Sequence, residues 1–242
     1  MLPVAILAGG LATRLRPITE KIPKSLLEVA GEPFIFHQLR ALRKAKIERV
    51  VLLIGYLGNL IQEKVKDGAA FGLKVSYVED GPELLGTGGA LLKALPTLGE
   101  EFFVLYGDSF LPINYANVLQ AFKESNKLAL LTVMKNNNQW DKSNVIYRNN
   151  LVHLYAKKTQ IPAMEYIDYG LGILTQKAFT SKKTAQKFDL ATLYFQLSLQ
   201  KELAGHEVFE RFYEIGSPKG LEETTKYLVG WASAQQTPKK EN

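Results

Sequence analysis

Two adjacent glycines and an arginine near the N-terminus are residue types that bind phosphate groups. They lie in the sequence LAGGLATR at residues 7–14, directly after an apolar run. Paired glycines let the backbone approach a ligand and direct N–H groups at phosphate oxygens, and an arginine can hold a phosphate with two hydrogen bonds. The spacing matches neither a P-loop nor the dinucleotide motif GxGxxG, so the glycines alone are also compatible with an ordinary turn after a strand.

An aspartate follows another apolar run, in the sequence YGDS at residues 106–109. At the carboxyl end of a parallel strand, the carboxylate of Asp108 would lie where such sheets bind ligands. An aspartate after glycine is otherwise common in turns and helix caps. Asp108 is therefore a candidate ligand-binding residue that needs support from a second motif.

The first glycine segment continues into a longer pattern that provides this support. Residues 7–33 read LAGGLATRLRPITEKIPKSLLEVAGEP. This sequence resembles LAGGxGTRLxPLTxxxPKxLLxVxGxP, the signature of the sugar-phosphate nucleotidyltransferases. One departure is Ala12, where the family usually has glycine. If that position has a positive φ, alanine costs roughly 1 kcal/mol there, which is tolerable.

The resemblance implies catalytic roles for Arg14, Lys24 and Asp108. Arg14 would hold the departing pyrophosphate, and Lys24 would neutralise phosphates at the reacting centre. The implied reaction is an in-line displacement at the α-phosphorus of a nucleoside triphosphate by an oxygen of a sugar 1-phosphate. Because the second pKa of a phosphate monoester is about 6, this nucleophile needs no general base. The nucleotide-binding residues that the resemblance implies are Leu7, Ala8, Gly9, Gly10, Thr13, Arg14, Glu83, Gly86, Thr87 and Gly88.

The resemblance also implies a Mg²⁺ cofactor held by Asp108 and a second carboxylate. The family often has Asp-Ile-Gly-Thr-Pro at the second position, and this chain has EIGSP at residues 214–218. The longer side chain of Glu214 moves its carboxylate by about 1 Å relative to aspartate. Glu214 is thus the expected second ligand, and the alternatives are a subfamily difference or a metal held less tightly.

The segment LGTGGAL at residues 85–91 resembles the family element that packs against the nucleobase and ribose. The acids Glu79, Asp80 and Glu83 precede it. A carboxylate can accept hydrogen bonds from N1–H and the 2-amino group of guanine, whereas uracil and thymine suit glutamine or backbone groups. This favours GTP, although the same acids could be exposed loop residues.

The sugar contacts implied by the resemblance lie in the second half of the chain. Many relatives have Glu-Lys-Pro where this chain has Ala156-Lys157-Lys158, so the usual acceptor for a sugar hydroxyl is absent, and Asp168 or Tyr169 could replace it. The expected sugar-binding residues are Asp108, Lys158, Asp168, Tyr169 and Gly170.

Apolar periodicity predicts the elements that position these residues. Strands are expected at 4–8, 49–54, 73–78 and 102–106, alternating with helices at 34–44, 59–66 and from 90 to 95. Shorter strands at 128–134, 145–148, 151–155 and 167–174 follow, with a helix at 189–203 and a helix start at Ser217-Pro218. The predicted fold class is α/β, with a Rossmann-like mixed and mainly parallel sheet flanked by helices, as in the GT-A-like nucleotidyltransferases.

Composition limits the class of protein. The chain has 242 residues, 46% hydrophobic and 22% charged, which suits a single domain, predicted over 1–232 with a flexible tail at 233–242. The net charge of +6 comes from lysines that form no stripe interleaved with aromatics, so no nucleic-acid partner is expected. There is no cysteine, and no apolar run approaches the roughly 20 residues of a membrane helix. We expect a cytoplasmic monomer or homodimer without membrane attachment.

Together these features predict transfer of a nucleoside monophosphate, with GTP favoured, to a sugar 1-phosphate. Within the family the segments most resemble the small bacterial guanylyltransferases for heptose 1-phosphate, with those for mannose 1-phosphate close behind. The alternatives are uridylyl transfer to N-acetylmuramate 1-phosphate and cytidylyl transfer to choline phosphate. A non-catalytic regulatory module would be expected to lose Arg14, Lys24 or Asp108, and all three are present.

Overall fold

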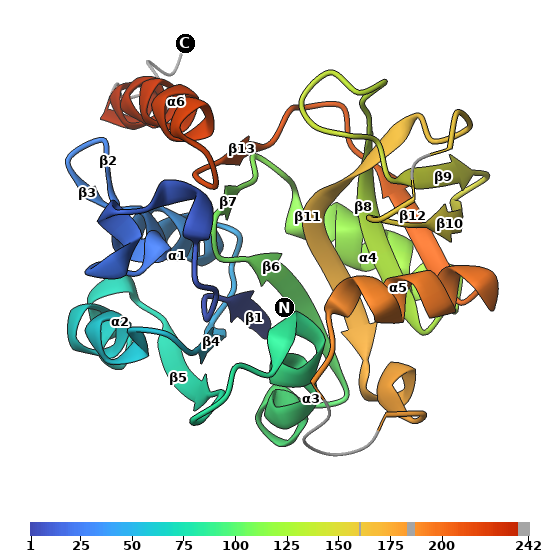
Figure 1. The fold of residues 1–242 in the computed structure, drawn as a ribbon, viewed down its shortest axis with the longest axis horizontal. Helices are drawn as coiled ribbons and strands as arrows, with labels where there is room; N and C mark the ends of the chain where they lie inside the picture. Colours follow the sequence, from blue (N-terminus) through green and yellow to red (C-terminus); the bar gives the residue numbers. More distant parts are fainter. Residues whose placement is uncertain (160, 183–186, 237–242) are drawn as a thin grey trace, which may run out of the picture.

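A nine-stranded sheet runs through the part of the chain described by the computed structural model, residues 1–159, 161–182 and 187–236 (Figure 1). The side chains of residues 232–236 are outside this description. In sheet order the strands are β5 (Lys74–Glu79), β4 (Arg49–Ile54), β1 (Val4–Leu7), β6 (Glu101–Tyr106), β11 (Tyr166–Thr175), β8 (Ala129–Lys135), β12 (Leu203–Glu207), β10 (Leu151–Tyr155) and β9 (Val145–Arg148).

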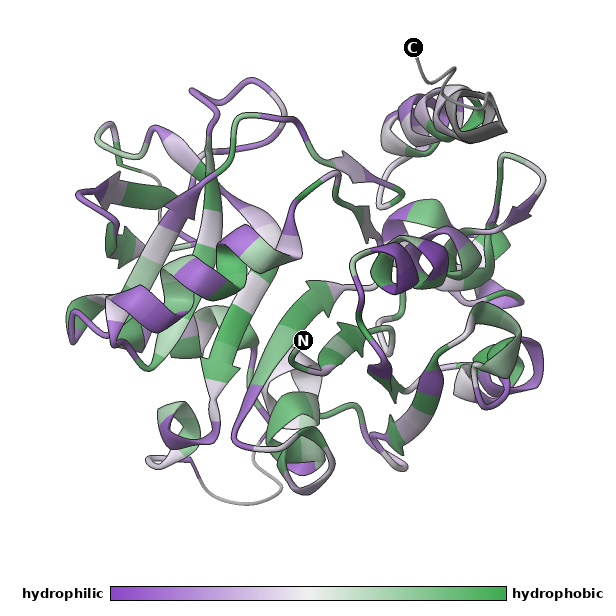
Figure 2. Ribbon diagram, turned by 180° about the vertical axis from the view of Figure 1, so that it is seen from behind, coloured by the Kyte–Doolittle hydropathy of each residue, from purple (hydrophilic) through white to green (hydrophobic). Residues whose placement is uncertain are grey.

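The first half of the sheet is parallel and carries the predicted phosphate-binding loops. Strands β5, β4, β1 and β6 pair in parallel, and β1 lies between β4 and β6. Their carboxyl ends therefore meet at one edge, where the chain order changes direction between β1 and β6. Open α/β sheets bind ligands at such a point. Of these strands, β4, β1 and β6 are buried on both faces over most of their length and are coloured mainly as hydrophobic in Figure 2.

The second half of the sheet is mostly antiparallel. Strand β11 pairs antiparallel with β6 on one side and with β8 on the other. The register with β8 shifts between Asp168 and Gly172, and Gly170 has a φ of 109° within this irregularity. Strand β12 returns to parallel pairing with β8, and β9 and β10 form an antiparallel hairpin through Asn149 and Asn150.

Helices cover both faces of the sheet because each presents one apolar side to it. Helices α1 (Phe34–Lys44), α2 (Gly58–Val65) and α4 (Tyr115–Ser125) pack in one buried cluster. Helices α3 (Gly86–Leu98) and α5 (Leu190–Leu199) pack in a second cluster on the other face. The short 3-10 helices are η1 (Thr13–Leu15), η2 (Ile18–Glu20), η3 (Lys24–Leu26), η4 (Ala69–Phe71) and η5 (Gln176–Phe179).

A small ribbon connects the end of the chain to the loop after β6. Strand β13 (Tyr213–Glu214) pairs antiparallel with β7 (Ser109–Phe110), so that Glu214 lies opposite Ser109. Helix α6 (Pro218–Gln236) follows, and Leu228 packs there with residues from the hairpin of β2 (Glu28–Val29) and β3 (Glu32–Pro33). Residues far apart in the sequence thus meet beside Asp108.

The structure confirms the predicted α/β class with a mixed sheet, and the helix at 34–44 and the strands at 49–54, 145–148 and 151–155 have the predicted bounds. The helix predicted at 189–203 ends at Leu199, and β12 begins at Leu203, so that part of the prediction is wrong. Helix α6 continues to Gln236, into the predicted tail of residues 233–242, and 237–242 lie outside the described residues, so the domain bounds stay a prediction. Within the described chain, no helix is sufficiently long and apolar to span a membrane.

Candidate active site

A pocket of about 240 Å³ opens at the carboxyl edge of the parallel strands. It lies where β1, β4 and β6 end and where α3 begins. The backbone supports it directly: Ala8 N donates to Leu53 O, and Gly107 N donates to Leu7 O. Its walls are Leu7, Ala8, Gly9, Gly10, Ala12, Lys24, Ser25, Leu53, Asp80, Leu84, Gly86, Thr87, Ala90, Tyr106, Gly107 and Asp108.

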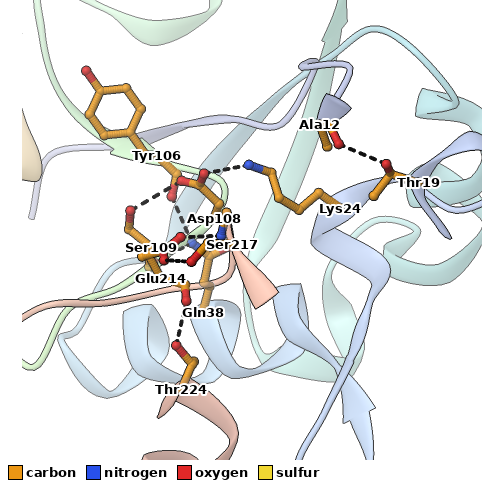
Figure 3. A network of polar contacts seen from close by, with 11 residues as sticks. Ala12, Thr19, Lys24, Gln38, Tyr106, Asp108, Ser109, Glu214, Ser217 and Thr224 are labelled. Carbon is orange, nitrogen blue, oxygen red and sulfur yellow. Dashed lines mark hydrogen bonds and ion pairs between the residues drawn. The ribbon is translucent and has the colours of Figure 1, made fainter. Parts of the chain in front are cut away.

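Lys24 and Asp108 face each other across this pocket. The Lys24 Nζ lies 2.6 Å from Asp108 Oδ2, and their side chains are 20% and 27% exposed (Figure 3). Lys24 begins η3 directly after Pro23, which has an extended conformation. Asp108 lies in the turn between β6 and β7. The two residues are separated by 84 positions, so only the fold brings the predicted catalytic cation and anion together.

Helix α1 holds the turn that carries Asp108. The buried amide of Gln38 donates hydrogen bonds from Nε2 to Tyr106 O at 3.0 Å and to Ser109 O at 2.8 Å. These carbonyls flank Asp108, so the amide fixes the turn on both sides. The Oε1 of Gln38 has no protein partner, whereas Ser109 Oγ donates to Asp108 Oδ1 at 3.3 Å.

Arg14, Asp108 and Glu214 converge on Gly216. A Cβ atom at this glycine would lie 2.7 Å from Glu214 Oε2, 3.2 Å from Arg14 Nη2 and 3.3 Å from Asp108 Oδ2. A side chain at position 216 would therefore have to displace the ends of these three functional side chains. Ile215 N donates to Asp108 O at 2.9 Å, which ties the two acidic segments together.

The Glu214 carboxylate also organises the start of α6. Its Oε2 accepts from Gly216 N, and its Oε1 accepts from Ser217 Oγ at 2.7 Å. Ser217 Oγ in turn accepts from Gly220 N at 3.0 Å, as the predicted helix cap. Each carboxylate oxygen therefore accepts one hydrogen bond from the protein and keeps a second lone pair.

These donors fit Mg²⁺, which commonly uses one or two carboxylates together with waters and substrate phosphates. Asp108 presents a partly exposed carboxylate to the pocket, and Glu214 lies beside it against Gly216. The described residues contain no group of three or more His, Cys, Asp or Glu side chains placed to hold a metal ion. A magnesium site here would therefore depend on phosphate oxygens of the substrates.

In the loop after β1, Ala12 has the left-handed backbone conformation for which the family signature usually has glycine. Ala12 has φ 48° and ψ 42°, in the left-handed region that disfavours a Cβ atom. Its carbonyl accepts hydrogen bonds from Thr19 Oγ1 at 2.9 Å and from Leu15 N at 3.1 Å. A side chain at position 9 would crowd the neighbouring backbone, since a Cβ atom there would lie 3.0 Å from Gly55 N. Thr13 and Arg14 are exposed in η1 beside the pocket.

Among the three acids before α3, the structure selects a different one from the predicted Glu83. Asp80 lines the pocket, and its Oδ2 accepts from Leu85 N at 3.2 Å. Burial raises the pKa of Asp80 above its usual range, opposed by the Leu85 hydrogen bond and by Lys93. Glu83 is exposed and lies outside the pocket lining. The expectation for Glu83 is thus corrected to Asp80, because the chain bends toward the pocket three residues earlier.

Gly86 and Thr87 line the pocket as expected, whereas Gly88 does not. A Cβ at Gly88 would lie 2.3 Å from the ring of Phe188. Gly88 thus makes room for a neighbouring aromatic ring outside the pocket wall, and its contact with the nucleotide stays a prediction.

Beyond Tyr106, a partly buried cluster surrounds Asp168. Its Oδ2 accepts from Tyr155 Oη at 3.0 Å and from Tyr106 Oη at 3.3 Å, and its Oδ1 accepts from Gly170 N at 3.0 Å. Burial raises the pKa of Asp168, opposed first by Lys157 and then by these hydrogen bonds. Lys157 Nζ lies 5.1 Å from the centre of the Tyr106 ring, so a cation lies over the aromatic wall.

The structure corrects two further sugar-site predictions. Tyr169 follows Asp168 in β11, so its side chain points to the opposite face of the sheet, where its ring is 1% exposed and packs against Phe212. Lys158 is exposed, and Lys157 is the residue that approaches Tyr106. Gly170 lies close to Ser109, where a Cβ would be 3.4 Å from its Oγ, so Gly170 and Asp168 remain beside the site.

Four site residues were missed by sequence reasoning: Ser25, Gln38, Tyr106 and Tyr155. Ser25 and Tyr106 adjoin predicted residues, so the motif itself could have identified them. Gln38 and Tyr155 carry no local signal, because their roles depend on contacts with residues distant in the sequence.

The chain is similar to known proteins over most of its length. Residues 4–216 match the family model described as Nucleotidyl transferase. The chain is 29% identical over 218 residues to D-glycero-alpha-D-manno-heptose 1-phosphate guanylyltransferase of Campylobacter jejuni, covering 88% of this chain and 94% of the relative. It is 26% identical over 220 residues to mannose-1-phosphate guanyltransferase beta-A of Xenopus laevis, covering 88% of this chain but only 61% of that longer relative.

A solved structure has the same fold. HddC from Yersinia pseudotuberculosis, determined in complex with GMP-PN, superimposes with a TM-score of 0.79 at 23% sequence identity. The match covers 94% of this chain and 100% of HddC.

Proposed function

The chain belongs to the nucleotidyl transferase family, and from this premise we propose that it transfers guanosine monophosphate from GTP to a sugar 1-phosphate. The observation that carries the proposal is the Lys24–Asp108 pair, set opposite the glycine loop in one pocket. A cation and a carboxylate on a backbone rich in N–H groups can neutralise a triphosphate and orient its α-phosphorus.

In the proposed reaction, an oxygen of the sugar phosphate forms a bond to the α-phosphorus. The bond from the α-phosphorus to the bridging oxygen breaks, and pyrophosphate leaves with that electron pair. Arg14 and Lys24 stabilise the charge on the phosphates, and the glycine loop binds them through its N–H groups. Mg²⁺ bound to Asp108, with Glu214 beside it, would add positive charge at the same phosphates.

The preference for guanine rests on Asp80. Its carboxylate lies in the pocket between β5 and the start of α3, beside Leu84 and Gly55. Guanine offers two adjacent donors, N1–H and the 2-amino group, which a carboxylate can accept together. Adenine has no such pair, so Asp80 would discriminate between the purines.

The acceptor is proposed to bind past Tyr106, near Asp168 and Lys157. These residues offer a carboxylate, a cation and tyrosine rings within contact of one another. Carboxylates accept hydrogen bonds from sugar hydroxyls, and aromatic faces pack against sugar rings. The wall of this region comes from side chains on β6, β10 and β11.

The test is pyrophosphate release with Mg²⁺, crossing GTP, UTP, CTP, ATP and dTTP with mannose, glucose, heptose and N-acetylmuramate 1-phosphates and choline phosphate. We expect turnover with GTP and one sugar phosphate. Asp80→Asn should reduce kcat/KM for GTP about tenfold, since the asparagine amide has a single acceptor oxygen and places an NH2 donor against the other guanine donor. Turnover with a pyrimidine triphosphate alone would contradict the guanine assignment, and no turnover with any pair would contradict the activity.

A further inference from the structure

The pocket turn at the start of α3 is held from outside by the start of α5. The hydroxyl of Thr87 donates a hydrogen bond to Asp189 Oδ1 at 2.8 Å and accepts one from Leu190 N at 2.8 Å. Asp189 is also the N-cap of α5, accepting from Ala191 N at 3.0 Å. Two helix starts that are about a hundred residues apart in the sequence therefore share one hydroxyl.

The backbone of Phe188 makes a second set of contacts with the same turn. Its carbonyl accepts from Gly88 N at 3.0 Å and from Gly89 N at 3.2 Å, and its N–H donates to Leu85 O at 3.1 Å. The residue before α3, Leu85, provides no side-chain cap. Two of the free N–H groups in the first turn of α3, those of Gly88 and Gly89, are thus satisfied by another segment of the chain.

Helix α5 is a firm support for these contacts. Leu190, Leu193, Tyr194 and Leu197 are each at most 2% exposed in the core. Ser198 Oγ accepts from Tyr155 N on β10 at 3.2 Å, so the same helix also contacts the strand that carries part of the Asp168 cluster. A displacement of α5 would consequently alter both the turn at Thr87 and the strand that carries Tyr155.

We propose that Asp189 is a positioning residue for nucleotide binding, acting through the Thr87 hydroxyl to hold the Gly86–Thr87 turn against the pocket. This inference rests on the proposed function, since it concerns the same nucleotide site. In this arrangement the Thr87 hydroxyl makes hydrogen bonds within the protein and does not contact the nucleotide. Thr87 forms the pocket wall, while its hydroxyl is committed to Asp189 and Leu190.

A double-mutant cycle distinguishes these two assignments. Asp189→Ala and Thr87→Val each break the shared hydrogen bond, and each should raise the KM for GTP about tenfold with a smaller change in kcat. If both act through one contact, the double variant should also remain near tenfold. If the Thr87 hydroxyl instead contacts the nucleotide independently, the two effects should multiply to about a hundredfold.

Matched variants separate positioning from stability. Asp189→Asn keeps an oxygen acceptor for Thr87 and for Ala191, and should restore KM to within about threefold of the wild type. Asn114→Ala removes the cap of α4, where Asn114 Oδ1 accepts from Ala116 N at 2.9 Å, at a distance from the pocket. It should lower stability as Asp189→Ala does, while leaving the KM for GTP unchanged.

Amide hydrogen exchange gives a readout that does not depend on activity. Asp189→Ala should accelerate exchange at Gly88, Gly89 and Leu190 in the unliganded protein, and Asn114→Ala should not. A wild-type protein without turnover would contradict the proposed function. If the wild-type protein has turnover, two results would overturn the positioning role. One is an unchanged KM for GTP in Asp189→Ala, and the other is a KM raised about a hundredfold in the double variant.

Discussion

The nucleotide side and the acceptor side of the site are constructed differently. On the nucleotide side, parallel strands end in loops whose backbone lines the pocket, and the Lys24–Asp108 pair is open to solvent. On the acceptor side, side chains from three strands surround Asp168, a partly buried carboxylate held by two tyrosine hydroxyls. In the proposed function, the nucleotide side would bind its ligand through backbone N–H groups and charged side chains, and the acceptor side through the side chains around Asp168. The first should therefore be sensitive to charge removal and the second to protonation.

The largest expected effect comes from charge removal on the nucleotide side. Asp108→Ala should lower kcat about 10²- to 10³-fold, because it removes the carboxylate paired with Lys24 at the reacting centre. Pyrophosphate release measures this loss, and thermal unfolding shows that the fold is retained. The exposed Glu63→Ala serves as the control and should keep full activity. Activity within threefold of wild type in Asp108→Ala would remove Asp108 from the catalytic residues.

A tenfold effect is expected when the turn under Asp108 is loosened. Gln38→Met keeps the size of the side chain but removes the amide that donates to the carbonyls of Tyr106 and Ser109. Each buried carbonyl left without a donor costs about 1–3 kcal/mol, so stability should fall and kcat should drop about tenfold. The same change at Gln62 is the control, because this partly buried side chain on α2 donates to the exposed Glu79 carboxylate and not to the turn under Asp108. A variant that loses stability but keeps kcat would show that the turn is held by its other contacts.

On the acceptor side, the prediction concerns pH. Because burial raises the folded-state pKa of Asp168, the folded state binds its proton more tightly than the unfolded state does. Its contribution to stability is complete below the ordinary aspartate pKa and is lost as pH rises through the raised folded pKa. Asp168→Asn removes the titrating group and therefore this loss. The free energy of unfolding of the variant minus that of the wild type should thus be larger at pH 8 than at pH 4. Chemical unfolding at both pH values measures it, and a constant difference would contradict the raised pKa.

The smallest expected effect tests the strained backbone of the nucleotide loop. Ala12→Gly should stabilise the protein by about 0.5 kcal/mol, because glycine relieves the left-handed φ of 48° but is more flexible in the unfolded chain. Ala41→Gly, in the middle of α1, should instead destabilise the protein by about 1 kcal/mol. Denaturant unfolding distinguishes the two signs. If Ala12→Gly were destabilising, the added flexibility of glycine in the unfolded chain would outweigh the relief of the left-handed φ, and the backbone strain at position 12 would be negligible.

The sequence alone determined the two phosphate-binding segments of the nucleotide side, although it did not specify the contact between them. The loop after β1 and the turn carrying Asp108 are local, since glycine and charged residues follow strands whose apolar runs identify them. The positive φ of Ala12 and the cap at Ser217 follow from the same local rules and agree with the structure. Their conformations depend on neighbours within a few residues, which is why the motif was sufficient.

Only the tertiary structure decided the acceptor side, the acid that lines the nucleotide pocket, and the supports of that pocket. Asp80 replaces Glu83, and Lys157 replaces Lys158, because a shift of a few residues along the chain changes which side chain reaches the pocket. Tyr169 turns away because the side chains of a strand alternate between the two faces of the sheet. The contact between Thr87 and Asp189 joins segments 102 positions apart. Such contacts follow from packing helices onto a completed sheet, and no local pattern in the sequence specifies them.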